Sequence, residues 1–222
     1  MNRKDLQPLR DHVEYAPEET LIRAQEFYAE MKRRRTVRDF SDKPVPCELI
    51  ETLLLTAGTA PSGANMQPWH FVAVSDAELK KKIRDAAEEV ERDFYQRRAP
   101  DYWLRDLERL ATDEHKPHLE EAPYLIVVFS QLHRVEPDET RTHHYYIAES
   151  VGISMGMLIT AVHHAGLVCL THTPQPMGFL RKLLKRPKHE TPVLILAVGY
   201  PKPDARVPKI SKKPLDKIST FM

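Results

Sequence analysis

The chain has 222 residues, enough to bury one sizeable core, and its 33 basic and 32 acidic side chains give a formal net charge of +1. This balance excludes a global electrostatic reason to bind nucleic acid or an anionic membrane, so any anion site must be local. Cys47 and Cys169 lie far apart without metal-site spacing, and we expect reduced core thiols in a reducing compartment. No apolar run approaches the ~20 residues of a membrane span, so we expect a soluble, cytoplasmic protein.

Apolar residues recurring every three or four positions predict a first helix over residues 17–32, which leads into a basic run. The same periodicity and the apolar runs of strand length predict the elements that follow, in chain order: helix 47–57, strand 70–75, helix 76–98 with Asp76 as its N-cap, helix 102–110, strand 123–129, helix 144–166, strand 167–173, helix 178–184 and strand 193–198. Segment 144–166 is apolar around most of its circumference, so we expect it in a core or an interface. From residue 199 onward, prolines forbid continuous helix or central strand, and this tail needs a surface to lie on. Together these elements indicate an α+β fold, with helices around a small sheet.

The basic run after the first helix consists of Arg34, Arg35, Thr36, Val37 and Arg38. In an extended conformation alternate side chains share one face, and guanidinium groups bind phosphate bidentately. The run therefore suits a phosphate monoester. Basic residues that merely complement a helix dipole explain the same run, and without further information that alternative is favoured.

Ser62, Gly63 and Ala64 form a small-residue loop that precedes the strand at residue 70. Glycine lets the backbone approach a ligand, and the amides of such a loop can bind a carbonyl or phenolate oxygen. An ordinary turn after a helix is the competing interpretation.

Thr171, His172 and Thr173 end a predicted strand, where open sheets present groups that face a ligand. A turn that closes the strand before Pro174 is an equally good explanation. Lys212 in the tail could add a phosphate contact, although composition alone favours a solvated lysine.

Glu91 and Tyr95 are four residues apart and project from one face of the charged helix, and Lys116 follows in the next segment. A zwitterionic amino acid needs an anion for its ammonium and donors for its carboxylate, which these three side chains provide. The high density of charged residues nearby favours a solvated helix face when the pattern is considered alone.

The eleven histidines include adjacent pairs, but none has the spacing to a carboxylate that is typical of a metal site, so we expect no metal. The sequence also lacks a Walker A loop, a G-x-G-x-x-G loop and the serine elbow of a nucleophilic triad. These observations argue against nucleotide hydrolysis and triad chemistry.

Taken together, the motifs resemble the flavin-dependent nitroreductase superfamily, and more closely its iodotyrosine deiodinase subfamily. The matching segments are Arg-Arg-Thr-Val-Arg, Ala-Pro-Ser-Gly-Ala with Pro-Trp, the Gly-Leu-Val strand ending in Thr-His-Thr-Pro, and Val-Gly-Tyr-Pro with Lys-Lys-Pro-Leu-Asp. The resemblance covers about residues 17–218, and Glu91, Tyr95 and Lys116 match the zwitterion-binding residues of the subfamily. Thr36 replaces a serine and Lys212 an arginine of the mammalian enzymes, and the second change weakens bidentate phosphate recognition.

The resemblance implies one FMN-binding domain over residues 1–222, with a three-layer α-β-α fold and a small mixed sheet. It implies an N-terminal arm over residues 1–17 and an extended C-terminal arm over residues 200–222. It also implies an interlocked homodimer with FMN at the subunit interface.

The resemblance assigns site residues to two groups. Those expected to bind FMN are Arg34, Arg35, Thr36, Val37, Arg38, Ser62, Gly63, Thr171, His172, Thr173 and Lys212. Those expected to bind substrate are Ala64, Glu91, Tyr95 and Lys116. Two of these residues have catalytic roles by this match: the Ala64 amide binds the substrate phenolate, and the Thr173 hydroxyl reaches N5 of the flavin.

The implied activity is reductive dehalogenation of mono- and diiodotyrosine to tyrosine and halide, with electrons from NAD(P)H directly or through a reductase. Residues 85–117 are hydrophilic enough to form a lid that becomes ordered when a ligand binds. Two other functions remain open: a general NAD(P)H-dependent nitroreductase or quinone reductase, and a flavin- or tyrosine-binding sensor without turnover.

Overall fold

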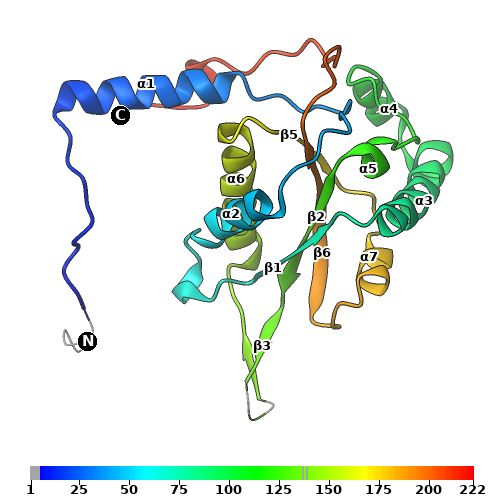
Figure 1. Cartoon of the computed structure of the whole chain (residues 1–222), viewed down its shortest axis with the longest axis horizontal. Coiled ribbons are helices and arrows are strands. Elements are labelled where there is room, and N and C mark those ends of the chain that lie inside the picture. The colour runs from blue at the N-terminus through cyan, green and yellow to red at the C-terminus, as the bar shows by residue number, and fades with distance from the viewer. Residues whose placement is uncertain (1–5, 137, 139) are drawn as a thin grey trace. The chain divides into compact units, whose positions relative to one another are not determined.

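The computed structural model describes residues 6–136, 138 and 140–222, and the chain forms two units, residues 1–34 and 35–222 (Figure 1). The first unit contains α1 (Pro17–Lys32), whose bounds confirm the predicted helix. Proline begins this helix, Glu18 and Glu19 lie in its first turn, and Arg23 pairs with Glu19 at 2.7 Å. The helix buries none of its own residues, and large apolar side chains such as Phe27 and Tyr28 are exposed.

The second unit is built on a sheet with the strand order β1-β2-β6-β5. Its elements follow the chain in the order α2 (Cys47–Gly58), β1 (Trp69–Val74), α3 (Ala77–Asp93), α4 (Asp101–Glu108), α5 (His118–Glu121), β2 (Tyr124–Gln131), β3 (His133–Val135), β4 (Arg141–His143), α6 (Ile147–His164), β5 (Val168–His172), α7 (Gly178–Leu183) and β6 (Glu190–Gly199). A 3₁₀ turn covers Gly63–Asn65, a π-helical turn covers Phe94–Arg98, and a second 3₁₀ turn covers Leu215–Lys217.

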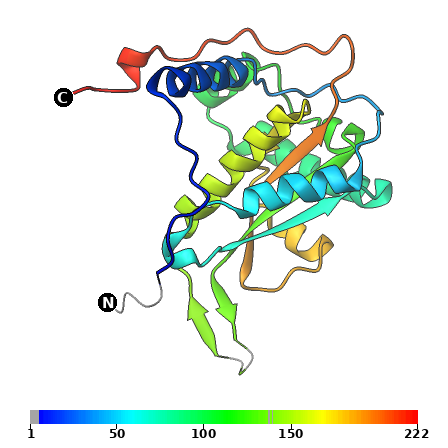
Figure 2. The same ribbon diagram turned by 60° about the vertical axis from the view of Figure 1, so that its left-hand side comes forward.

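The sheet differs from the mixed sheet that the resemblance implied. All three strand pairings, β1 with β2, β2 with β6 and β6 with β5, are antiparallel. Within the described part of the chain, parallel pairing is confined to an isolated bridge between Thr36 and Cys169, where the basic run lies against the edge strand β5. β3 and β4 form a separate antiparallel hairpin that extends beyond the sheet (Figure 2).

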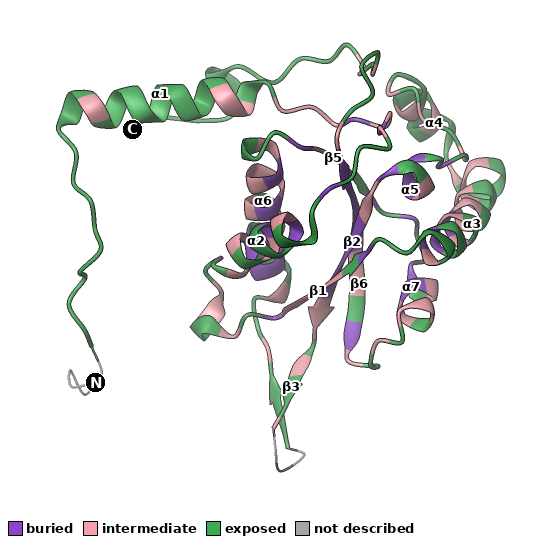
Figure 3. Cartoon of the chain, in the orientation of Figure 1, coloured by how far each residue is buried: buried purple, intermediate pink, exposed green. Residues whose placement is uncertain are grey.

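Helices cover both faces of the sheet, which confirms the three-layer α-β-α fold. On one face, α2 and α6 pack through Leu53 and Leu158 against alternate sheet residues such as Ile126 and Leu196. On the other face, α3, α5 and α7 pack against the intervening sheet residues, which include Val127 and Ile195. Because successive strand residues point to opposite faces, β2 and β6 are buried on both sides and read as continuous apolar runs (Figure 3).

Most predicted elements are present with small shifts of their ends. Asp76 caps α3 as predicted, and its carboxylate accepts a hydrogen bond from the Leu79 amide at 2.7 Å. The predicted helix over residues 76–98 ends as a π-helical turn, and α5 and the β3–β4 hairpin were missed because they are short and polar. Cys169 is buried, but the prediction of a core thiol was wrong for Cys47, which is exposed at the start of α2.

The tail after β6 is extended, as predicted. Its first part is tied to residues 39–40: Phe40 bridges Pro201, and Asp39 accepts hydrogen bonds from the amides of Lys202 (2.9 Å) and Arg206 (3.1 Å). Further along, large apolar side chains are exposed, and Phe221 retains 84% of its surface. Among the described residues, the helices are too short or too polar to traverse a lipid bilayer.

Candidate active site

A cleft of about 320 Å³ lies where the end of α3, the π-helical turn, α4 and the end of β5 meet. Several residues singled out in the sequence line it together: Arg38, Glu91, Tyr95, Lys116, Thr171, His172 and Thr173. The structure thus brings the proposed amino-acid-binding trio to the strand end that carries Thr173 and to one arginine of the basic run.

Glu91 and Lys116 form a buried ion pair in this cleft. Lys116 Nζ lies 3.3 Å from Glu91 Oε2, and the two side chains are only 3% and 13% exposed. Burial raises the pKa of the Glu91 carboxyl, which Lys116 partly offsets, and burial lowers the pKa of the Lys116 ammonium, which Glu91 partly offsets. Each charge therefore depends on the other, because an isolated charge in this position would be strongly destabilised.

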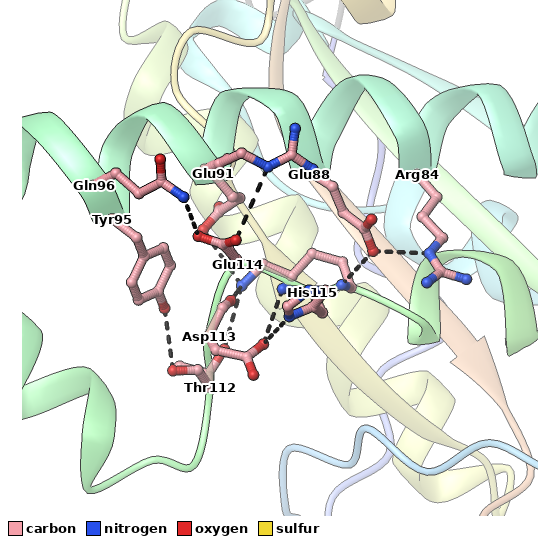
Figure 4. Close-up of polar contacts among 11 residues, drawn as sticks. Arg84, Glu88, Glu91, Tyr95, Gln96, Thr112, Asp113, Glu114 and His115 are labelled. Atoms are coloured by element: carbon pink, nitrogen blue, oxygen red, sulfur yellow. Dashed lines mark hydrogen bonds and ion pairs between the residues drawn. The ribbon is translucent and has the colours of Figure 1, made fainter.

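The segment that carries Lys116 is tied to α3 by hydrogen bonds (Figure 4). The Tyr95 hydroxyl donates to the Thr112 carbonyl oxygen at 3.2 Å, and the Lys116 amide donates to Glu88 Oε1 at 2.7 Å. Arg84 holds the same Glu88 oxygen at 2.8 Å from one turn earlier on α3. These contacts set the depth at which Lys116 enters the cleft.

Two buried histidines lie next to the ion pair. The rings of His118 and His172 meet edge to face at 5.6 Å, and His172 Nε2 lies 3.8 Å from Glu91 Oε1. Burial lowers the pKa of His118 to about 3 and that of His172 to about 2, with nearby positive charges adding to the effect. Both imidazoles are therefore neutral at physiological pH.

The same cleft has an apolar wall. It is formed by Val90, Phe94, Trp103 and Leu107, and the rings of Phe94 and Trp103 meet edge to face at 5.1 Å. The wall suits an aromatic ring, because apolar and edge-to-face contacts stabilise ring burial. These residues were not expected in the site, although Trp103 and Leu107 lie four apart on a helix, a spacing that predicts a shared face.

Arg38 offers a donor without a partner. It is half-buried, and its Nε makes no hydrogen bond within the part of the chain that the structure describes. Burial lowers the pKa of this guanidinium, while Tyr95 and Asp39 act in the opposite direction. A buried unsatisfied donor is costly, so this nitrogen fits an acceptor atom of a bound ligand.

The other members of the basic run have different environments. Arg35 donates from Nη2 to the Pro208 carbonyl oxygen of the tail, and Val37 is buried, with its amide donating to the Cys169 carbonyl oxygen at 3.3 Å. Thr36 is half-buried at the bridge to Cys169, and Arg34 belongs to the first unit. Of the five residues, Thr36 makes a parallel bridge to Cys169, and only Arg38 lines the cleft.

The loop of Ser62, Gly63 and Ala64 does not line this cleft, and neither does Lys212, which is exposed in the tail. Ser62 Oγ accepts a hydrogen bond from the Gln67 amide at 2.9 Å, and the Gly63 amide donates to Ser150 Oγ at 3.4 Å. Ala64 is exposed and has a φ of 47°, a left-handed conformation that is costly for alanine. Such strain is typical of a functional loop, although in one chain this loop and the cleft are separate.

The described residues contain no group of three or more histidine, cysteine, aspartate or glutamate side chains that could hold a metal ion.

Comparisons with known proteins agree with this fold. The model of the nitroreductase family matches residues 31–200. An iodotyrosine deiodinase of Haliscomenobacter hydrossis is 53% identical over 201 residues, which cover 90% of this chain and 90% of the relative, and human iodotyrosine deiodinase 1 is 45% identical over 93% of this chain and 72% of its own length. A crystal structure of oxidized iodotyrosine deiodinase bound to FMN and 3-iodo-L-tyrosine has a TM-score of 0.75 at 34% identity, covering 88% of this chain and 100% of that one. The chain therefore belongs to the nitroreductase family, and within it to the iodotyrosine deiodinase branch.

Proposed function

We propose that this protein is an FMN-dependent dehalogenase that converts mono- and diiodotyrosine to tyrosine and iodide. The observation that carries the proposal is the buried Glu91–Lys116 pair, which lies in one cleft with Tyr95 and an apolar wall. Glu91 receives the ligand ammonium, Lys116 and Tyr95 receive its carboxylate, and the wall packs on the iodinated ring. A relative in the same branch is described as bound to FMN and 3-iodo-L-tyrosine, which supports both ligands.

The residues of this chain fit FMN at the edge of the same cleft. The unpartnered Nε of Arg38 supplies a donor there, and Thr171, His172 and Thr173 line the adjoining wall at the end of β5. We propose that Arg34, Arg35, Thr36 and Lys212 bind the phosphate end, with Val37 fixing the backbone of the run. Bound FMN would supply the electrons for loss of halide. In this proposal the Thr173 hydroxyl donates a hydrogen bond to its ring system, and closure of the cleft over the ligand excludes water.

We propose that two copies of the chain form the complete site. The loop of Ser62, Gly63 and Ala64 does not line the cleft of its own chain, so a second copy would bring it there. Ser62 and Gly63 would then contact the flavin, and the Ala64 amide would donate to the substrate phenolate. Exposed apolar side chains on α6 and the tail, including Ile153 and Ile218, support a buried interface between copies.

The proposed catalytic unit is a single domain with two terminal arms that reach the partner, and NAD(P)H reduces it directly or through a reductase. We also propose that Cys47 and Cys169 work as thiols in a reducing compartment such as the cytoplasm.

The proposal is tested by titrating the FMN-loaded protein with 3-iodotyrosine while following flavin fluorescence. Stacking of the iodinated ring on the flavin should quench the fluorescence in a saturable manner, and 2-iodophenol should bind more weakly because it lacks both charges. Absence of any response to 3-iodotyrosine, together with rapid reduction of nitroaromatics by NAD(P)H, would favour a general nitroreductase instead.

A further inference from the structure

The Ser62–Ala64 loop, which is proposed to bind the phenolate, has a costly backbone conformation. Ala64, Asn65 and Gln67 have φ values of 47°, 54° and 49°. A left-handed conformation is unfavourable for residues that carry a Cβ, so contacts with the rest of the fold must keep the loop in place. The direction in which Ala64 presents its amide therefore depends on these contacts.

Hydrogen bonds within the loop determine its internal shape. Ser62 Oγ accepts from the Gln67 amide at 2.9 Å, and the Ser62 carbonyl oxygen accepts from the Asn65 amide at 3.0 Å. The Gly63 carbonyl oxygen accepts from the Met66 amide at 3.0 Å. These partners all lie in the loop, so they close it on itself without fixing where it lies on the fold.

Two serines of α6 attach the loop and the preceding segment to the rest of the unit. Ser150 and Ser154 are both buried and lie four residues apart, on one face of the helix. Ser150 Oγ accepts a hydrogen bond of 3.4 Å from the Gly63 amide, and Ser154 Oγ donates to the Ala57 carbonyl oxygen at 2.7 Å. Because Ala57 lies at the end of α2, α6 holds the connecting segment at both of its ends.

The contacts of Ser150 fix the direction of its hydrogen bonds. Its single hydroxyl hydrogen is donated to the Tyr146 carbonyl oxygen at 2.6 Å, so only lone pairs remain for the loop, and these match the Gly63 amide. Tyr146 itself has a left-handed φ of 52° at the start of α6. A Cβ added at Gly63 would lie 3.1 Å from its ring. Two strained segments therefore meet at Ser150.

We propose that Ser150 is a positioning residue for the substrate phenolate: it holds the Gly63 amide and thereby fixes the turn on which Ala64 presents its own amide. This inference rests on the proposed function, in which the Ala64 amide donates to the phenolate. Ser150 acts through the loop and does not touch the ligand. Without its hydroxyl, the Gly63 amide loses its acceptor and the loop can relax from the left-handed conformation. The loss should fall on the phenolate and spare the rest of the ligand.

Two ligands that differ only in the phenolic hydroxyl test this role. They are 3-iodotyrosine and 3-iodophenylalanine, and the ratio of their affinities for the FMN-loaded protein is measured by titrating the flavin fluorescence. We expect the wild-type protein to prefer 3-iodotyrosine by at least about tenfold, because a hydrogen bond to a phenolate is charge-assisted. Ser150→Ala should bring this ratio to within about twofold of unity and change the affinity for 3-iodophenylalanine by less than about twofold.

Ser154→Ala is the matched control, because it removes a buried hydroxyl from the same face of α6. The Ala57 end of the segment is also held by the core, where Leu53 of α2 and Leu158 of α6 belong to one cluster, so the affinity ratio should stay as in the wild-type protein. Ser150→Thr retains an acceptor hydroxyl and should keep the wild-type ratio. A ratio that is unchanged in Ser150→Ala, or that falls equally in Ser154→Ala, would overturn the inference.

Hydrogen exchange of the Gly63 amide provides a readout that needs no ligand. It is followed by NMR in the FMN-loaded protein without substrate. We expect exchange to accelerate by about tenfold or more in Ser150→Ala and to stay unchanged in Ser154→Ala. If Ser150→Ala does not fold, the wild-type rate decides: a Gly63 amide that exchanges as fast as in an unstructured peptide is not held by Ser150, and the inference is wrong.

The two ligands also separate this inference from the function on which it rests. If the wild-type protein prefers 3-iodotyrosine and Ser150→Ala keeps that preference, only the role of Ser150 fails. If the wild-type protein binds neither ligand, or binds both equally well, the proposed recognition of the phenolate fails, and the role of Ser150 fails with it.

Discussion

His172, which lines the cleft, and His118, which packs against it, have strongly lowered pKa values. Each ring is buried, and the edge-to-face contact between them leaves no room for two positive charges. Both Nε2 atoms lack hydrogen bonds among the described residues, so a proton taken up there would find no acceptor at normal distance. Their neutrality lets Lys116 and Glu91 be the charges that a ligand meets.

Neutral buried histidines predict that the protein loses stability in acid. The folded-state pKa of His172 is lowered to about 2, below the ordinary value of about 6.5 in the unfolded chain. Its contribution to stability is therefore complete above about pH 6.5 and is lost as the pH falls towards the folded-state pKa, because the unfolded chain takes up a proton that the folded protein excludes. Between about pH 6 and pH 4, each such histidine should lower the free energy of unfolding by about 1.4 kcal/mol per pH unit.

Urea denaturation at a series of pH values measures this slope. For His172→Gln the slope should be shallower than in the wild-type protein by about that amount, and His143→Gln, at an exposed position, is the control. Equal slopes for His172→Gln and the wild-type protein would show that the folded protein protonates this histidine.

Charge type and spacing gave a functional interpretation for some residues of the cleft, but did not favour it over a solvated helix face. Glu91 and Tyr95 could be placed on one helix face, and both line the cleft. Lys116 could not be chosen from the sequence pattern alone, because its approach to Glu91 depends on a segment that folds back onto α3. It was identified by resemblance, and His118 was missed altogether, since a polar residue after a proline gives no sign that it will be buried.

One side of the cleft consists of α3, the π-helical turn and the segment up to Lys116, which together are called the α3–Lys116 region. Polar contacts hold this region together. Tyr95 donates to the Thr112 carbonyl, Gln96 contacts Glu114 at 3.4 Å, and Arg92 lies 3.9 Å from the same carboxylate (Figure 4). Several of these partners are exposed, so each contact contributes little to stability. The α3–Lys116 region can therefore open locally at a small cost in free energy, as a lid requires.

We therefore predict that 3-iodotyrosine protects the α3–Lys116 region from cleavage by trypsin. Arg97, Arg105 and Arg109 are exposed cleavage sites within it, and binding to Glu91 and Lys116 should join its two ends and slow cleavage several-fold. The rates are compared by mass spectrometry with and without ligand, and 4-ethyl-2-iodophenol, which lacks the charged end, is the control. Identical cleavage rates with and without 3-iodotyrosine would exclude a lid that becomes ordered on binding.

Long periodic helices and apolar strands were predictable, because the spacing of apolar residues along the sequence reflects directly which side chains are buried. α1 begins and ends where the sequence predicts, and β2 and β6 read as apolar runs because both of their faces are covered. The pairing direction of the strands was not predictable from such runs, and the mixed sheet expected from the resemblance proved antiparallel. A short helix such as α5 is stabilised by its surroundings rather than by its own sequence, so it gives no periodic signal.

The C-terminal tail of the molecule exposes several large apolar side chains. Ile210, Leu215, Ile218 and Phe221 in the tail each expose half of their surface or more. Clusters of this kind are typical of surfaces that bind another protein. The Ser62–Ala64 loop also does not line the cleft of its own chain. Both observations support the proposal that two chains share the sites.

Removal of residues 209–222 tests this proposal. We expect the shortened chain to fold, because both apolar clusters of the sheet lie outside this segment, but to dimerise more weakly and to release FMN more readily. Sedimentation velocity gives the mass of the full-length and shortened proteins, and equilibrium dialysis gives the FMN affinity. A shortened chain that remains a dimer with unchanged FMN affinity would contradict a role for the tail in the interface.

Release of iodide from 3-iodotyrosine by the reduced protein is the most direct test of the central claim. The FMN-loaded protein is reduced with dithionite under anaerobic conditions and mixed with 3-iodotyrosine, and iodide and tyrosine are quantified together. We expect equal amounts of both products from the wild-type protein and a large loss of the reaction in Lys116→Ala. Reduction of FMN without release of iodide, when 3-iodotyrosine is bound at saturation, would contradict it.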